Sequence, residues 1–123
     1  MGERNTRIGT TTQEHLIVDD QKPIVSDSYT VKSGQGVIRR GTPLGVETAS
    51  GKLKKCLSTN SDGSQVIFAI LTTDIDTTSA DVKSPVYLEG TFNPEEIIWQ
   101  GSDTVETHRM NARRVGIYFK RVI

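Results

Sequence analysis

The sequence VYLEGTFNPEEIIW, from Val86 to Trp99, specifies its backbone more tightly than any other part of the chain. It opens as a β-strand, and Gly90 predicts a bend after that strand. A short helix is expected to begin at Asn93, because Asn is a good cap and Pro94 suits the first helical position. Glu96 follows three residues after the cap, as in a capping box. The stretch contains no nucleophile, phosphate-binding loop or metal-ligand set, so it predicts architecture rather than chemistry.

Short strands separated by turns are predicted on both sides of this stretch. The six apolar residues 66–71 predict a central strand that is covered on both faces. Two other strands are expected to form a hairpin across Gly51, which supplies the positive φ that such a connection needs. The expected strands cover residues 24–31, 37–40, 44–48, 52–57, 66–71, 84–91 and 117–123.

A second, longer helix is predicted over residues 103–115. Ser102 or Asp103 is expected to cap it and Gly116 to end it. Glu106 in the first turn and arginines near the other end match the helix dipole. Many short strands and few helices therefore predict a mainly β fold (α+β) with one or two short helices.

The first 22 residues have a different character from the rest. They are polar and threonine-rich, with one apolar island at residues 16–18. Such a segment does not bury enough surface to offset its ordering entropy, so we expect a flexible N-terminal arm over residues 1–22. Its threonines and its apolar island have strand propensity, so the arm is suited to add a strand to a partner sheet. A plain disordered terminus is the alternative. Residues 23–123 are expected to form a single globular β-rich domain.

Bulk properties limit the classes of protein to consider. Hydrophobic residues make up 34% of the 123 residues, with one Trp, three Phe and three Tyr. This low content fits a protein that completes its burial against partners, and it also fits a small loop-rich β domain. The lone Cys56 excludes an internal disulfide. We find no signal-peptide pattern and no run of about eighteen apolar residues, and therefore expect a soluble protein made in a reducing cytoplasm, without membrane contact.

Charge is balanced overall but unevenly distributed. The 15 basic and 15 acidic residues give a net charge of zero, so no global field attracts a polyanion. From His108 onward there are five basic residues and no acid, which leaves the first 107 residues at 10 − 15 = −5. This division predicts a dipole-matched helix and complementary surfaces between subunits, with a nucleic-acid-binding module as a less favoured alternative. The five basic residues are Arg109, Arg113, Arg114, Lys120 and Arg121.

The search for catalytic or metal-binding patterns gives little. His15 and His108 are the two histidines, and neither stands at zinc-site spacing. A Cys56–His108 dyad is a weak possibility, and calcium binding by Asp74, Asp76 and Asp81 is less favoured than a solvated turn. Residues 34–36 are not followed by a helix, which argues against a phosphate site. Trp99 is expected either in the core or as an interface anchor. We therefore predict no catalytic residue, no metal and no cofactor.

The motif around Phe92 resembles the head decoration proteins of lambda-like tailed bacteriophages. A second matching stretch, residues 41–45, precedes a short hairpin at 50–53 and the apolar run at 66–71. The resemblance extends over about residues 37–123, whereas the first thirty or so residues are longer and poorer in proline than the arm of that family. The motif positions are Gly90, Thr91, Phe92, Asn93, Pro94, Glu95, Glu96, Ile98 and Trp99.

The resemblance implies a β-clip-like fold and a structural, non-enzymatic function. It implies a homotrimer on the outer surface of the expanded phage head, at three-fold positions, that binds the major capsid protein and stabilises the shell against DNA pressure. The protein would be made in the host bacterial cytoplasm and end in the virion. A small β-clip ligand-binding or enzyme-accessory module is the alternative function. The arm residues expected to bind the capsid are Ile8, Thr10, Thr11, Thr12, Leu16, Ile17 and Val18.

Overall fold

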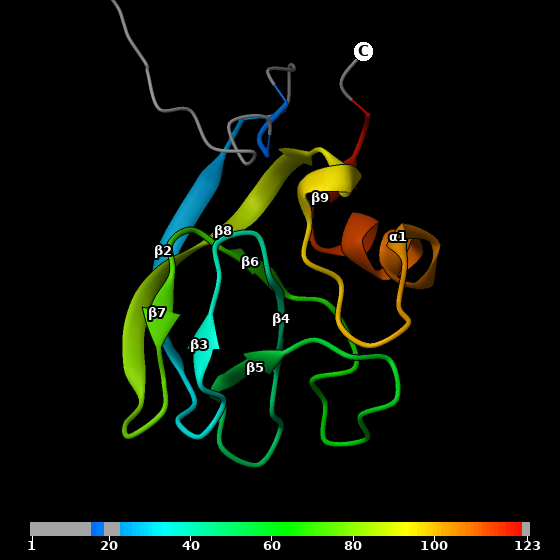
Figure 1. Cartoon of the computed structure of the whole chain (residues 1–123). Coiled ribbons are helices and arrows are strands. Elements are labelled where there is room, and N and C mark those ends of the chain that lie inside the picture. Colours follow the sequence, from blue (N-terminus) through cyan, green and yellow to red (C-terminus); the bar gives the residue numbers. More distant parts are fainter. Residues whose placement is uncertain (1–15, 19–22, 122–123) are drawn as a thin grey trace, which may run out of the picture.

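A computed structural model describes residues 16–18 and 23–121 and shows a mainly β fold with one α-helix, as predicted. Figure 1 shows the strands gathered on one side and the helix on the other. The strands are β2 (Val25–Val31), β3 (Val37–Ile38), β4 (Pro43–Val46), β5 (Leu53–Lys55), β6 (Ala69–Leu71), β7 (Ile75–Asp76), β8 (Val82–Phe92) and β9 (Ile117–Phe119). The helices are the 3₁₀-helix η2 (Pro94–Glu96) and the α-helix α1 (Val105–Arg114).

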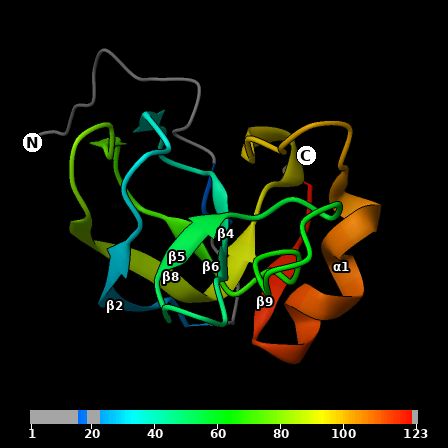
Figure 2. The same ribbon diagram turned by 90° about the horizontal axis from the view of Figure 1, so that it is seen from below.

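Five of the strands form a closed, barrel-like ring. Their order is β2-β5-β4-β6-β8, and β2 pairs again with β8 along an antiparallel ladder, which joins the two ends of the sheet. Strand β9 adds in parallel to the last three residues of β8 and places α1 beside the ring (Figure 2). The short pair β3–β7 forms a separate two-stranded sheet. The predicted hairpin is present as the antiparallel pair β4–β5.

The strand expected at residues 84–91 is present as β8, and Gly90, expected as a bend after the strand, lies within it, because β8 continues to Phe92. Before Gly90 it pairs with β2 and β6, and from Gly90 onward it pairs with β9. Gly90 has φ +150°, a conformation that side chains disfavour, and a Cβ there would lie 3.2 Å from the ring of Phe92. The glycine therefore lets the strand change partners without ending.

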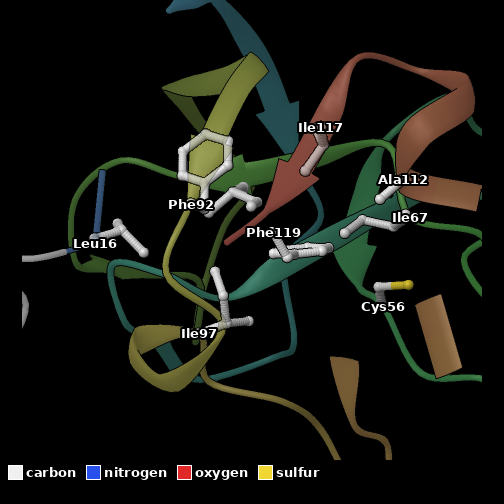
Figure 3. Close-up of a cluster of buried hydrophobic side chains, with 9 residues drawn as sticks. Leu16, Cys56, Ile67, Phe92, Ile97, Ala112, Ile117 and Phe119 are labelled. Atoms are coloured by element: carbon white, nitrogen blue, oxygen red, sulfur yellow. The ribbon is translucent and has the colours of Figure 1, made fainter. Parts of the chain in front are cut away.

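The core consists of two clusters. One fills the ring of strands and consists of Val31, Ile38, Leu44, Leu53, Ala69, Leu71 and Val86. The other lies between β8, β9 and α1 and consists of Leu16, Cys56, Ile67, Ile70, Phe92, Ile97, Ala112, Ile117 and Phe119 (Figure 3). The predicted central strand at 66–71 is correct in position but too long, because only Ala69–Leu71 is a strand and Val66 is 44% exposed.

Both predicted helices are present, but the N-terminal bound and the cap of the second differ from the prediction. The side chain of Asn93 accepts a hydrogen bond from Glu95 N, and Pro94 takes the first position, as predicted. Helix α1 begins later than expected, with Thr104 as its N-cap, and Gly116 follows its end. Neither Ser102 nor Asp103 caps it, because the carboxylate of Asp103 points instead to partners in another part of the fold.

Gly45 in β4, the last residue of the second matching stretch (residues 41–45), allows a close approach of another backbone segment. A Cβ at this position would lie 2.7 Å from Ser64 Cα and 2.7 Å from Val66 O. Both are backbone atoms, and real Cβ atoms do not approach so closely. The loop after residue 60 therefore packs directly on β4 because Gly45 has no side chain.

Gly45→Ala is expected to lower the free energy of unfolding by about 3 kcal/mol or more, since a well-packed site has no room for the added methyl group. Gly51→Ala is the matched control, because Gly51 has φ +75° and open space around it. The control should lose only the backbone cost, about 1–2 kcal/mol. Urea unfolding of both variants measures the difference, and equal losses would contradict the steric role.

Candidate functional site

The apolar island before residue 19 is seated against the end of β8. We call Leu16, Ile17 and Val18 the N-terminal latch. Val18 N donates to Thr91 O at 2.9 Å, and Asn93 N donates to Leu16 O at 2.8 Å. Ile17 forms an antiparallel bridge with Phe92. The latch thus behaves as a very short additional strand.

The side chain of Leu16 is fully buried in the chain's own core. Figure 3 shows it beside Phe92, on the side away from Phe119. The expectation that Leu16 faces the capsid does not fit this position, because its surface is already covered by the same chain. Ile17 and Val18 are partly buried. The other residues predicted to bind the capsid, Ile8, Thr10, Thr11 and Thr12, lie outside the described residues, so their role stays a prediction.

The motif residues gather around the latch. Gly90, Thr91 and Phe92 end β8, and the next residues form the capped 3₁₀-helix. Glu95 in that helix pairs with Arg121, beyond β9. Ile98 N donates to Gly41 O at 3.1 Å, which joins this motif to the second matching stretch. These residues fix the geometry of one end of the molecule.

Trp99 belongs to the structure of this end rather than to an open surface. Its indole N–H donates to Pro94 O at 3.1 Å, which closes the turn after η2. Its ring stacks parallel to His108 with 5.8 Å between centroids and meets Phe119 edge-on at 5.4 Å. Trp99 therefore packs over the core cluster around Phe92, which is one of the two roles expected for it.

Beneath Trp99 lies a set of side chains that resembles a catalytic triad. His108 Nε2 lies 2.8 Å from Asp103 Oδ2, and His108 Nδ1 lies 3.8 Å from Cys56 Sγ. Asp103 also accepts from Ser58 N at 2.8 Å and from Ser58 Oγ at 2.6 Å. The sequence suggests the Cys56–His108 pair only as a less favoured alternative. Ser58 and Asp103 were missed, because Asp103 looked like a helix cap.

The electrostatics of this set oppose nucleophilic catalysis. Cys56 and His108 are buried, with 0% and 1% exposed. Burial, together with the charge of Asp103, raises the pKa of Cys56 to about 12, which disfavours the reactive thiolate. Burial alone would raise the pKa of Asp103, but hydrogen bonds from Ser58 and His108 outweigh it, and that pKa is lowered. The set is therefore suited to hold the start of α1 against the segment after β5.

The acidic residues considered for calcium have other partners. Asp74 accepts from Arg40 N, Asp76 from Thr78, and Asp81 from Ser33 N. In the part of the chain that the structure describes, no group of three His, Cys, Asp or Glu side chains is arranged to hold a metal ion. No helix among the described residues is long and apolar enough to cross a membrane.

The basic residues near the C-terminus make local contacts. Arg109 donates to Phe119 O at 3.2 Å and pairs with Glu106, and Arg114 donates to Asn111. A pocket of about 250 Å³ lies elsewhere, lined in part by Lys54, Lys55, Leu57, Asn60 and Gln100. Lys54 there is bound to Asp62 at 2.5 Å.

Asp103→Asn tests the buried set. Because the folded pKa of Asp103 is lowered below its usual 3.8, the carboxylate stabilises the fold above that pH, and the contribution disappears as the pH falls through the folded pKa. The variant should lose about 1–3 kcal/mol of unfolding free energy at pH 7 and show a smaller further loss on acidification. Urea unfolding at pH 7 and at about pH 3 measures both. An unchanged acid dependence would refute the assignment.

Comparison with known proteins agrees with this architecture. Residues 5–116 match the family described as bacteriophage lambda head decoration protein D. The matched range includes the latch, both motif stretches and α1, and it ends just before β9. A search of curated proteins found no match. Because the family match covers far more than half of the chain, the chain belongs to the bacteriophage lambda head decoration protein D family.

Proposed function

We propose that this phage head decoration protein binds the outer surface of the expanded capsid as a homotrimer. It sits at the three-fold and quasi-three-fold positions of the shell and holds neighbouring major capsid proteins together against the pressure of packaged DNA. Membership of the head decoration family supports the location in the virion capsid. The trimer, the outer surface and the stabilising effect are the further steps of the proposal.

The observation that carries the mechanism is the seated latch. Leu16 is fixed in the core beside Asn93, which follows the end of β8, so an arm that precedes it has a defined point of attachment to the body. We propose that the capsid-binding arm consists of residues 1–15, rather than 1–22, and that it orders by pairing with an exposed capsid strand. Three such arms on one trimer bind with avidity, because each later arm binds at high effective concentration.

Binding only the expanded shell requires a docking strand that is accessible in that state alone, which is a difference in affinity between two states. Two features of the body support adhesion as the function. Ile24 and Val25, near the latch in sequence, are 41% and 40% exposed and offer apolar contact area. The buried position of Cys56 and its raised pKa argue against this thiol as a nucleophile. We propose no metal, cofactor or nucleic-acid partner.

The trimer is tested in solution. One chain has a mass of 13.5 kDa, so the purified protein should sediment with three times that mass. The acidic body and the basic C-terminal end provide complementary surfaces, so we expect the trimer to weaken at high salt. Sedimentation at low and high ionic strength measures this. A monomer at every salt and protein concentration tested would contradict a preformed trimer.

Deletion of residues 2–14 tests the arm. The shortened protein should keep its unfolding free energy, since Leu16 stays in place, and should no longer coat expanded, undecorated heads. A deletion that extends through Val18 is a poor test, because it also removes a core side chain. Coating is measured by co-sedimentation with the heads and by electron microscopy.

The matched control replaces residues 2–14 with a Gly/Ser segment of equal length. This control preserves the chain length while removing the strand-forming side chains, so it too should fail to coat. Full coating by either variant would exclude the arm mechanism. Failure of the unmodified protein to bind heads would exclude the proposed function itself.

A further inference from the structure

The latch and β2 run in one direction along β8. Ile17 lies opposite Phe92, Val25 opposite Glu89 and Val31 opposite Val82, both segments being antiparallel to β8. As the chain advances from the latch into β2, the paired residue in β8 therefore has a lower and lower number. Leu16, the first described residue of the latch, therefore lies at the end of β8, where Asn93 follows the strand (Figure 1).

The antiparallel pairing of the latch with β8 decides how the latch resists a pull on Leu16 along the strand axis. Hydrogen bonds between antiparallel strands are perpendicular to the strands. A pull along the strand axis therefore loads both latch hydrogen bonds together, in shear, instead of opening them one after the other. The buried side chain of Leu16 must leave the core in the same event. A pull at right angles would separate the contacts in sequence.

The partner of the latch is itself held firmly. Thr91 and Asn93 bond to the latch, whereas Gly90 and Phe92 bond to the C-terminal part of the chain through Gly116 O and Lys120 N. The backbone N–H and C=O groups of alternate residues in a strand point to opposite edges of that strand. The end of β8 is therefore hydrogen-bonded on both edges. The ring of Phe92 is fully buried and lies 5.5 Å from that of Tyr87. Load on Leu16 thus passes into the core.

We propose that Leu16 is a load-bearing joint, a positioning residue that transmits the hold of a capsid-bound arm to the globular body. This proposal rests on the proposed function, because it requires an arm that binds the shell. Leu16 then has a role in keeping the protein bound to the capsid, separate from its contribution to the stability of the fold.

The experiment compares two core truncations of equal chemistry. Leu16→Ala removes the joint, and Leu53→Ala removes a leucine that is equally buried in the other core cluster, away from the latch. Both should lower the unfolding free energy to a similar extent. Protein is bound to expanded heads at a temperature at which both variants are folded trimers, and its release after dilution is followed.

We expect Leu16→Ala to dissociate about tenfold faster than the unmodified protein or more, and Leu53→Ala to dissociate at nearly the unmodified rate. Leu16→Met, which conserves volume, should restore slow release. If Leu16→Ala does not fold, Leu16→Val and Leu53→Val give the same comparison with a smaller truncation. Equal release rates for a matched pair would overturn the joint. Absence of coating by the unmodified protein would instead overturn the proposed function, so the two failures are distinguishable.

Discussion

The structure depends on the end of β8 being hydrogen-bonded on both edges. The latch occupies one edge through Thr91 and Asn93, and β9 occupies the other from Gly90 to Phe92. The two segments come from opposite ends of the described chain. Their shared partner strand therefore closes the core cluster around Phe92 and holds the C-terminal strand in place. Without the end of β8, Leu16 and Ile117 would both lose the surface against which they are buried.

The two core clusters stabilise different parts of the molecule. The cluster inside the ring of strands maintains the body, and Gly45 separately lets the backbone near Ser64 pack directly on β4. The cluster around Phe92 connects the body to the latch and α1. The Asp103–His108 pair supports the second cluster from beneath Trp99. Apolar burial and one buried polar set thus stabilise the same end of the molecule.

Local signals in the sequence were enough for much of this fold. Asn93 and Pro94 begin the 3₁₀-helix as predicted, because capping depends on neighbours in the chain. Signals that compete with distant partners were misjudged. Asp103 has a good capping side chain, yet it binds Ser58 and His108. Leu16 looked like an exposed apolar residue in a polar segment, because its hydrogen-bond partner Asn93 is far away in sequence. Composition and periodicity carry no information about such pairings.

The burial of Cys56 has a practical consequence. It is the single cysteine of the chain, and its thiol is fully enclosed. A cysteine introduced at an exposed position such as Val37 or Met110, which are 61% and 62% exposed, would be the one thiol accessible to a maleimide in the folded protein. Fluorophores or other cargo are therefore attachable at one chosen site per subunit, without first removing the native cysteine.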